Sequence, residues 1–183
     1  MLRLDGVEAA YGPSRVLHGV TLEAREGEVV SLLGRNGAGK STTLKSIVGL
    51  VEVTGGSIDL DGQALQGLPT HEISRLGVGW VPEDRRIFSD LTVARTLMGN
   101  PRILLLDEPS EGLAPVIVQT LAHQIAALKR EGLTILLSEQ NLKFAARLAD
   151  RAYIIEKGQI RWEGPMSRLL EDEVTRRDRK SVV

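Results

Sequence analysis

The chain has 183 residues, of which 42% are hydrophobic and 26% are charged, and its formal net charge is −1. This length and composition are typical of one folded domain with a core, and the charge excludes a global basic field that would attract nucleic acid or an anionic membrane. The chain has no cysteine, which excludes disulfides and thiolate metal sites. Its longest apolar runs have the length of strands, so we expect no direct membrane insertion. Because a global basic field is lacking, we also expect no nucleic-acid partner.

The order of the predicted elements indicates an α/β fold. Two loosely alternating stretches, 2–11 and 15–24, flank a Gly-Pro-Ser turn and predict an antiparallel β subdomain at the start of the chain. The apolar run 28–33 predicts a buried strand, and residues 42–48 predict a helix. Later strands are expected at 57–60, 78–82, 103–106 and 134–137, helices at 70–76 and 115–130, and further elements at 142–149, 152–155, 160–163 and 165–171. This alternation favours a parallel core sheet with helices on both faces.

Residues 34–41 read G-R-N-G-A-G-K-S, which matches the phosphate-binding loop G-x-x-x-x-G-K-[ST] in its required place between a strand and a helix. The glycines let consecutive N–H groups face one point, and the helix dipole makes that point an anion site. We therefore predict binding of a nucleoside triphosphate with magnesium, in which Lys40 reaches the outer phosphates, Ser41 ligates Mg²⁺ and Thr42 adds a phosphate contact. A glycine-rich turn without a ligand is the alternative. The predicted binding residues are Gly34, Arg35, Asn36, Gly37, Ala38, Gly39, Lys40, Ser41 and Thr42.

A second motif, I-L-L-L-D-E at 103–108, is an apolar strand that ends in two acids. In a phosphate-loop enzyme the first acid, here Asp107, holds magnesium, and the second, Glu108, orients or deprotonates an attacking water. Acids at the end of a strand that simply face solvent are the alternative. The phosphate loop favours the functional interpretation.

At these motifs the chain resembles the ATP-binding subunits of ABC transporters, and the resemblance includes P-S-E-G-L-A-P at 109–115. Residues 81–88, 91–93 and 138–141 look most like the branch that serves branched-chain amino acid importers, the LivF type. The resemblance implies a P-loop NTPase fold with a RecA-like core, and ATP and Mg²⁺ as cofactors. It also implies transmembrane permease subunits and a second nucleotide-binding subunit as partners, and a cytoplasmic location, peripheral on the inner face of the cell membrane through the permease.

The resemblance implies roles for three more residues. Tyr11 stands where the family has an aromatic ring that stacks on adenine. Glu83 stands where most relatives have a glutamine that senses the γ-phosphate, and Gln140, a catalytic candidate, stands where many have a switch histidine. Gln140 cannot carry a proton as histidine does. The alternatives are strand packing for Tyr11 and a solvated surface position for Glu83 and Gln140.

The chain departs from the family after residue 93. In the family a helical subdomain of several tens of residues follows and ends in the signature L-S-G-G-Q, whereas here 93–94 leads straight into R-T-L-M-G-N-P at 95–101 and no Ser-Gly-Gly occurs anywhere. We expect an ABC-type domain over 1–171 with an internal deletion near 93–95 and the helical subdomain missing. Each lost donor to the phosphoryl group typically lowers the rate ~10²–10³-fold. We therefore expect MgATP binding with poor hydrolysis; a catalytically inactive nucleotide-binding module is the alternative.

Residues 172–183 are expected to form a charged, disordered tail. The last six residues, D-R-K-S-V-V at 178–183, read as a common sequencing adapter would if it were translated through to a stop. This suggests that 178–183 is not biological; an ordinary charged C-terminus is the alternative. A phosphate-loop GTPase or small-molecule kinase is disfavoured, because the chain has no N-K-x-D motif and no lid-like arginine cluster.

Overall fold

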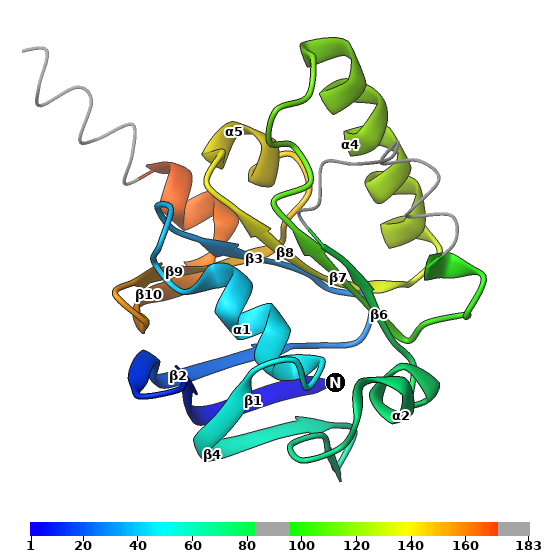
Figure 1. Cartoon of the computed structure of the whole chain (residues 1–183). Helices are drawn as coiled ribbons and strands as arrows, with labels where there is room; N and C mark the ends of the chain where they lie inside the picture. Colours follow the sequence, from blue (N-terminus) through cyan, green and yellow to red (C-terminus); the bar gives the residue numbers. More distant parts are fainter. Residues whose placement is uncertain (83–95, 172–183) are drawn as a thin grey trace, which may run out of the picture.

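Two β-sheets with helices between and above them make up the described part of the chain, residues 1–82 and 96–171, in the computed structural model (Figure 1). The first sheet has the strand order β2-β1-β4-β5 and the second has the order β10-β9-β3-β8-β7-β6. The helices are α1 (Lys40–Ile47), α2 (Thr70–Arg75), α4 (Pro115–Arg130) and α5 (Leu142–Ala145). Helix α1 lies between the two sheets, and α4 and α5 cover the opposite face of the second sheet (Figure 1).

The first sheet is antiparallel, as the loosely alternating N-terminal sequence predicts. Strand β1 (Leu2–Tyr11) pairs on one side with β2 (Ser14–Ala24) and on the other with β4 (Glu52–Leu60), which in turn pairs with β5 (Gln63–Ala64). The prediction of a strand at 57–60 is therefore too short. Two glycines within 52–60 weaken the strand pattern in the sequence, whereas pairing with β1 extends the strand to Glu52.

The second sheet is the parallel core that the α/β pattern predicts. Strands β9 (Arg151–Glu156), β3 (Val29–Leu33), β8 (Thr134–Glu139), β7 (Ile103–Asp107) and β6 (Val78–Val81) run parallel, and β10 (Gln159–Pro165) closes the edge antiparallel to β9. Every residue of β3, β7 and β8 is buried. Such continuous apolar strands require cover on both faces of the sheet.

The core accordingly has two layers, one on each face of this sheet. Side chains alternate along β7: Ile103 and Leu105 pack toward α1 and the antiparallel sheet, while Leu104 and Leu106 pack toward α4 and α5. Strand β6 connects to β7 through residues 82–102, and no helical subdomain is present in the described part of that connection, 82 and 96–102.

Helices α1 and α5 differ most from their predicted bounds, and α2 ends one residue earlier than predicted. Helix α1 begins at Lys40 rather than at 42, because Gly39 with its positive φ of 111° caps it directly at the end of the loop. Helix α5 ends at Ala145, whereas the sequence predicts one continuous element over 142–149. Helix α4 matches its prediction, with Pro115 in the first turn, where a missing N–H is tolerated.

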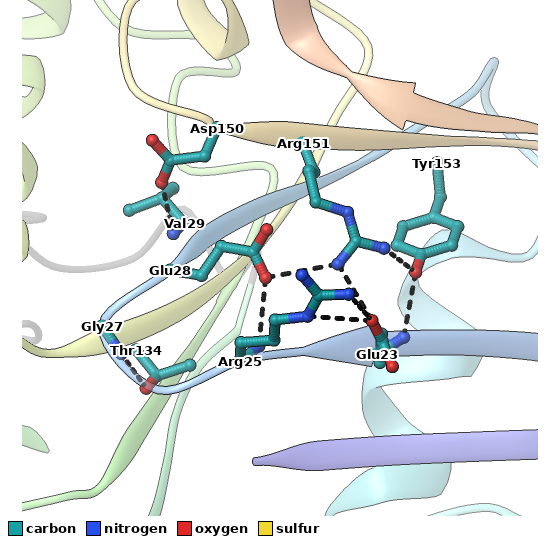
Figure 2. Close-up of polar contacts among 9 residues, drawn as sticks. All are labelled: Glu23, Arg25, Gly27, Glu28, Val29, Thr134, Asp150, Arg151 and Tyr153. Carbon is teal, nitrogen blue, oxygen red and sulfur yellow. Dashed lines mark hydrogen bonds and ion pairs between the residues drawn. The ribbon is translucent and has the colours of Figure 1, made fainter.

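A charged network ties the two sheets together (Figure 2). Arg151 of β9 reaches Glu23 of β2 at 3.3 Å and Glu28 at 3.4 Å, and donates a 2.6 Å hydrogen bond to the hydroxyl of Tyr153. The same hydroxyl accepts the backbone N–H of Glu23 at 3.1 Å. A hydrogen bond from Arg25, more than Arg151 itself, lowers the pKa of Glu23. The network therefore holds the antiparallel sheet against the core sheet at β9.

Candidate nucleotide-binding site

The phosphate loop follows the strand β3 in the middle of the core sheet. The loop ends at α1, so the predicted order of strand, loop and helix is confirmed. Gly37 and Gly39 have φ of 77° and 111°, the left-handed region that favours glycine. Residues 35–37 are exposed and 38–40 are buried. The loop thus has one face open to solvent and one face packed on the protein.

Lys40 is held beneath the loop by three acceptors. Its ammonium donates to the carbonyl oxygens of Gly34 at 2.8 Å and Arg35 at 3.1 Å. It also forms an ion pair with Glu108 Oε1 at 2.9 Å, in which the side chains are only 2% and 5% exposed. A lysine has three N–H donors, so these contacts occupy all of them. A phosphate entering the loop would compete with these acceptors for the ammonium.

Ser41 and Asp107 meet at the carboxyl end of β7. The Ser41 hydroxyl donates to Asp107 Oδ1 at 3.0 Å, and the Ser138 hydroxyl, from the neighbouring position on β8, donates to the same oxygen at 2.7 Å. Magnesium prefers one or two carboxylate ligands together with phosphate and water oxygens. The oxygens of Ser41 and Asp107 therefore fit the cation that the sequence predicts. Sequence reasoning missed Ser138, although its place at the end of the next strand was a signal.

Glu108 takes a strained backbone conformation directly after β7. Its φ is 46°, unusual for a residue with a side chain, and its N–H donates to the Ser138 carbonyl at 3.0 Å. Such outliers persist where the surrounding structure imposes them and are frequent at functional sites. The bend turns the carboxylate of Glu108 toward Lys40 instead of solvent, which argues against the alternative of a solvated acid.

Glu139 is a buried acid that sequence reasoning did not assign to the site. It ends β8, is 1% exposed, and accepts the backbone N–H groups of Ser110 at 3.1 Å and Asn141 at 3.2 Å. Burial raises the pKa of Glu139, and the nearby charge of Glu108 raises it further. Its carboxylate thus joins the loop after β7 to the loop after β8. A charged residue at the end of an apolar strand was the available signal.

The structure brings Lys40, Ser41, Asp107 and Glu108 together, and it leaves Tyr11 and Gln140 exposed at the ends of β1 and β8. Tyr11 is 48% exposed, so its ring is not packed in the core as the strand-packing alternative requires. Glu83 lies outside the described residues. Base stacking by Tyr11 and the roles of Gln140 and Glu83 stay predictions.

Comparison with known proteins identifies the family. BraG of Pseudomonas aeruginosa, a high-affinity branched-chain amino acid transport ATP-binding protein, is 38% identical in an alignment that covers 87% of the chain and 91% of BraG. The chain belongs to the ABC transporter family of ATP-binding proteins. The sequence pattern described as ABC transporter matches residues 17–95 of this ABC protein.

This ABC protein is also similar to a second ATP-binding protein in sequence and to a solved ATP-binding cassette in structure. LptB of Escherichia coli K12, the lipopolysaccharide export system ATP-binding protein, is 29% identical over 96% of the chain and 95% of LptB. The ADP conformation of an ATP-binding cassette of an ABC transporter superposes with a TM-score of 0.86, at 20% identity, over 94% of this chain and 95% of that one. The second likeness confirms the predicted fold.

Family membership makes this chain an ATP-binding module. ATP-binding subunits of ABC transporters work with transmembrane permease components, and Mg²⁺ accompanies the nucleotide in the family. Across residues 1–82 and 96–171, none of the helices combines the length and the apolar character needed to cross a membrane.

Proposed function

We propose that this chain is the ATP-binding subunit of an importer of branched-chain amino acids. In this role it would lie at the cytoplasmic face of the membrane, against transmembrane permease subunits and beside a second nucleotide-binding subunit. The relative BraG, by its name a branched-chain amino acid transport protein, supports this substrate at 38% identity. LptB, named for lipopolysaccharide export, is 29% identical. The higher identity therefore favours amino acid uptake.

We propose that MgATP binds at the loop 34–42. The observation that carries this proposal is the convergence of Lys40, Ser41, Asp107 and Glu108 at the carboxyl ends of β3 and β7, with Ser41 Oγ 3.0 Å from Asp107 Oδ1 and Lys40 Nζ 2.9 Å from Glu108 Oε1. Lys40 and the loop N–H groups would bind the phosphates, and Thr42 would add a contact. Bound Mg²⁺ would supply positive charge that neutralises the phosphates.

The nucleotide would change the environment of Glu108. In this arrangement the Glu108 carboxylate is occupied by the Lys40 ammonium. Phosphates that attract Lys40 would release the carboxylate, which would then orient a water together with Gln140. Tyr11 would stack on the base, and Glu83 would sense the γ-phosphate. Binding would thus free the group that chemistry needs.

We further propose that this chain hydrolyses ATP poorly, owing to an internal deletion near residues 93–95. The alignment with BraG has 211 positions, whereas 87% of 183 residues is about 159 residues, so about 52 positions have no counterpart in this chain. The sequence also has no L-S-G-G-Q segment. A helical subdomain with its signature would account for a difference of this size. The matching domain is then 1–171, followed by 172–183.

The coding DNA tests both the deletion and the proposal that 178–183 is not biological. We would amplify it from its source across codons 85–105 and through the stop. A longer product with a signature motif would mean that the printed sequence is a shortened copy of an ordinary ABC ATPase. An unchanged product would mean that the deletion is present in the gene itself, and the same last six codons would contradict the proposal that 178–183 is not biological.

A second candidate is a nucleotide-binding module without catalytic activity. The same loop geometry supports it. Helix α1 carries Lys40 and Ser41 and strand β7 carries Asp107, and both are present although the chain lacks the signature segment. MgATP affinity without dimerisation or turnover would favour this candidate, and turnover that Glu108→Gln abolishes would favour the ATPase.

Binding itself is tested by titration with a fluorescent ATP analogue in the presence and absence of Mg²⁺. We expect Asp107→Asn to weaken binding with Mg²⁺ at least tenfold, about 1.4 kcal/mol, and to have a smaller effect without Mg²⁺. The matched control is Asp59→Asn, on the antiparallel sheet. Excess GTP should compete less well than ATP. If the unaltered chain does not bind MgATP, the proposed function is wrong.

A further inference from the structure

The turn between β9 and β10 is a two-residue loop, Lys157-Gly158, that closes the strand pair Glu156 and Gln159. Lys157 and Gly158 have φ of 49° and 72°, both positive, which is the hairpin turn that matches the twist of the strands. The turn lies at the edge of the core sheet and contains none of the residues assigned to the nucleotide. It nevertheless contacts the phosphate loop as well as β2.

Gly158 holds one peptide group of the phosphate loop in a fixed orientation. Its N–H donates to the carbonyl oxygen of Ala38 at 2.8 Å. In a trans peptide the C=O and the next N–H point in opposite directions, and the described chain has no cis peptide. Fixing the Ala38 carbonyl toward the turn therefore directs the Gly39 N–H away from the turn, so the turn sets the direction of one of the N–H groups proposed to bind phosphate.

The same turn packs closely beneath Gly39. A Cβ placed on Gly39 would lie 3.0 Å from Leu17 Cδ2, 3.3 Å from Ile155 Cδ1 and 3.4 Å from Gly158 Cα. Ile155 belongs to β9, directly before the turn, and Leu17 belongs to β2. The buried face of the loop thus rests on the end of the β9–β10 hairpin and on one residue of the antiparallel sheet.

Gly158 also connects the hairpin to β2. Its carbonyl accepts the N–H of His18 at 2.8 Å, and a Cβ at Gly158 would lie 1.9 Å from the Val16 carbonyl oxygen. A separation below 3.0 Å requires a shift, so any side chain at this position would displace the hairpin from β2 by about 1 Å. Strand β2 pairs with β1, which ends at Tyr11.

We infer that the Lys157-Gly158 turn positions the phosphate loop for nucleotide binding, and that Gly158 is its key positioning residue. The turn fixes the Gly39 N–H direction and at the same time sets the loop relative to the β1–β2 hairpin that carries Tyr11. This inference rests on the proposed binding of MgATP. It assigns a binding role to a residue that contacts no phosphate.

Gly158→Ala tests the inference, and Gly62→Ala is its matched control. Gly62 occupies the same place in a two-residue hairpin loop, Asp61-Gly62 with φ of 51° and 84°, but a Cβ there meets no atom within 4 Å. Both variants acquire similar backbone strain. We expect Gly158→Ala to raise the Kd for MgATP, and for magnesium tripolyphosphate as competitor, at least about tenfold, and Gly62→Ala to leave both unchanged. Equal effects of the two variants on affinity would overturn the inference.

A second pair of variants decides the case if Gly158→Ala does not fold. Ile155→Val removes the Cδ1 methyl group, which lies 3.3 Å from a Cβ placed on Gly39, and Ile135→Val makes the same change in β8, in the core cluster on the other face of the sheet. We expect about a threefold higher Kd for MgATP with Ile155→Val only. Equal Kd values for both would overturn the inference. Absence of binding in the unaltered chain would instead contradict the proposed function.

Discussion

Replacing Lys40 with methionine tests how much the buried ion pair contributes to stability. The ammonium contacts Glu108 at 2.9 Å, the Gly34 carbonyl at 2.8 Å and the Arg35 carbonyl at 3.1 Å, and the lysine side chain is 2% exposed. Methionine keeps most of the apolar stem and removes the charge and all three donors. The Glu108 carboxylate then stays buried and loses the Lys40 ammonium.

The expected loss follows from this burial. Removing one partner of a buried ion pair destabilises a protein by about 3–5 kcal/mol, a large part of the roughly 5–15 kcal/mol that keeps a domain folded. Adding Glu108→Gln removes the remaining charge. We expect the double variant to regain most of the loss and to stay about 1–3 kcal/mol below the parent, because two carbonyl groups have lost their donor.

Urea unfolding followed by circular dichroism at neutral pH measures these free energies, with Lys129→Met as the control. Lys129 pairs with Asp150 at 2.6 Å, but the side chains are 32% and 44% exposed, so we expect its loss to cost less than about 1 kcal/mol. The reasoning is refuted if Lys40→Met costs no more than Lys129→Met. It is also refuted if the double variant is no more stable than Lys40→Met alone.

Two further predictions concern charged groups that sequence reasoning did not assign to the site. Burial raises the pKa of Glu139 above its ordinary value of 4.5, so between these two pKa values the folded chain binds more protons than the unfolded chain. The free energy of unfolding should therefore fall as the pH rises from 4.5 through the raised pKa of the folded state. In urea unfolding at several pH values, Glu139→Gln should remove this decline; a constant difference between the two proteins would contradict it. Arg151→Met should cost about 1–3 kcal/mol in the same assay, because Glu23 and Glu28 lose a charged partner; a loss below about 0.5 kcal/mol would contradict a role in joining the sheets.

The core sheet could be predicted from sequence because its strands carry a strong local signal. Strand β7 is apolar at four successive positions and ends in acids, and the loop before α1 has a fixed pattern of glycines. Support of the loop has no comparable signal. The bond from Gly158 to Ala38 joins residues 120 positions apart, and Gly158 in the sequence indicates only a hairpin turn. Likewise, the contacts of Glu139 depend on how β7 and β8 lie side by side.

The location of the proposed deletion explains how binding could survive without efficient turnover. Strand β8 pairs with β3 on one side and with β7 on the other, and described residues pack into a core cluster on each face of the sheet. The groups that would hold MgATP, Lys40, Ser41 and Asp107, belong to this core and have their partners within it. In the family, the signature of one subunit supplies hydrogen-bond donors to the γ-phosphate that the second subunit holds. Loss of that segment therefore removes a stabiliser of the transition state while the ground-state contacts remain, which separates affinity from rate.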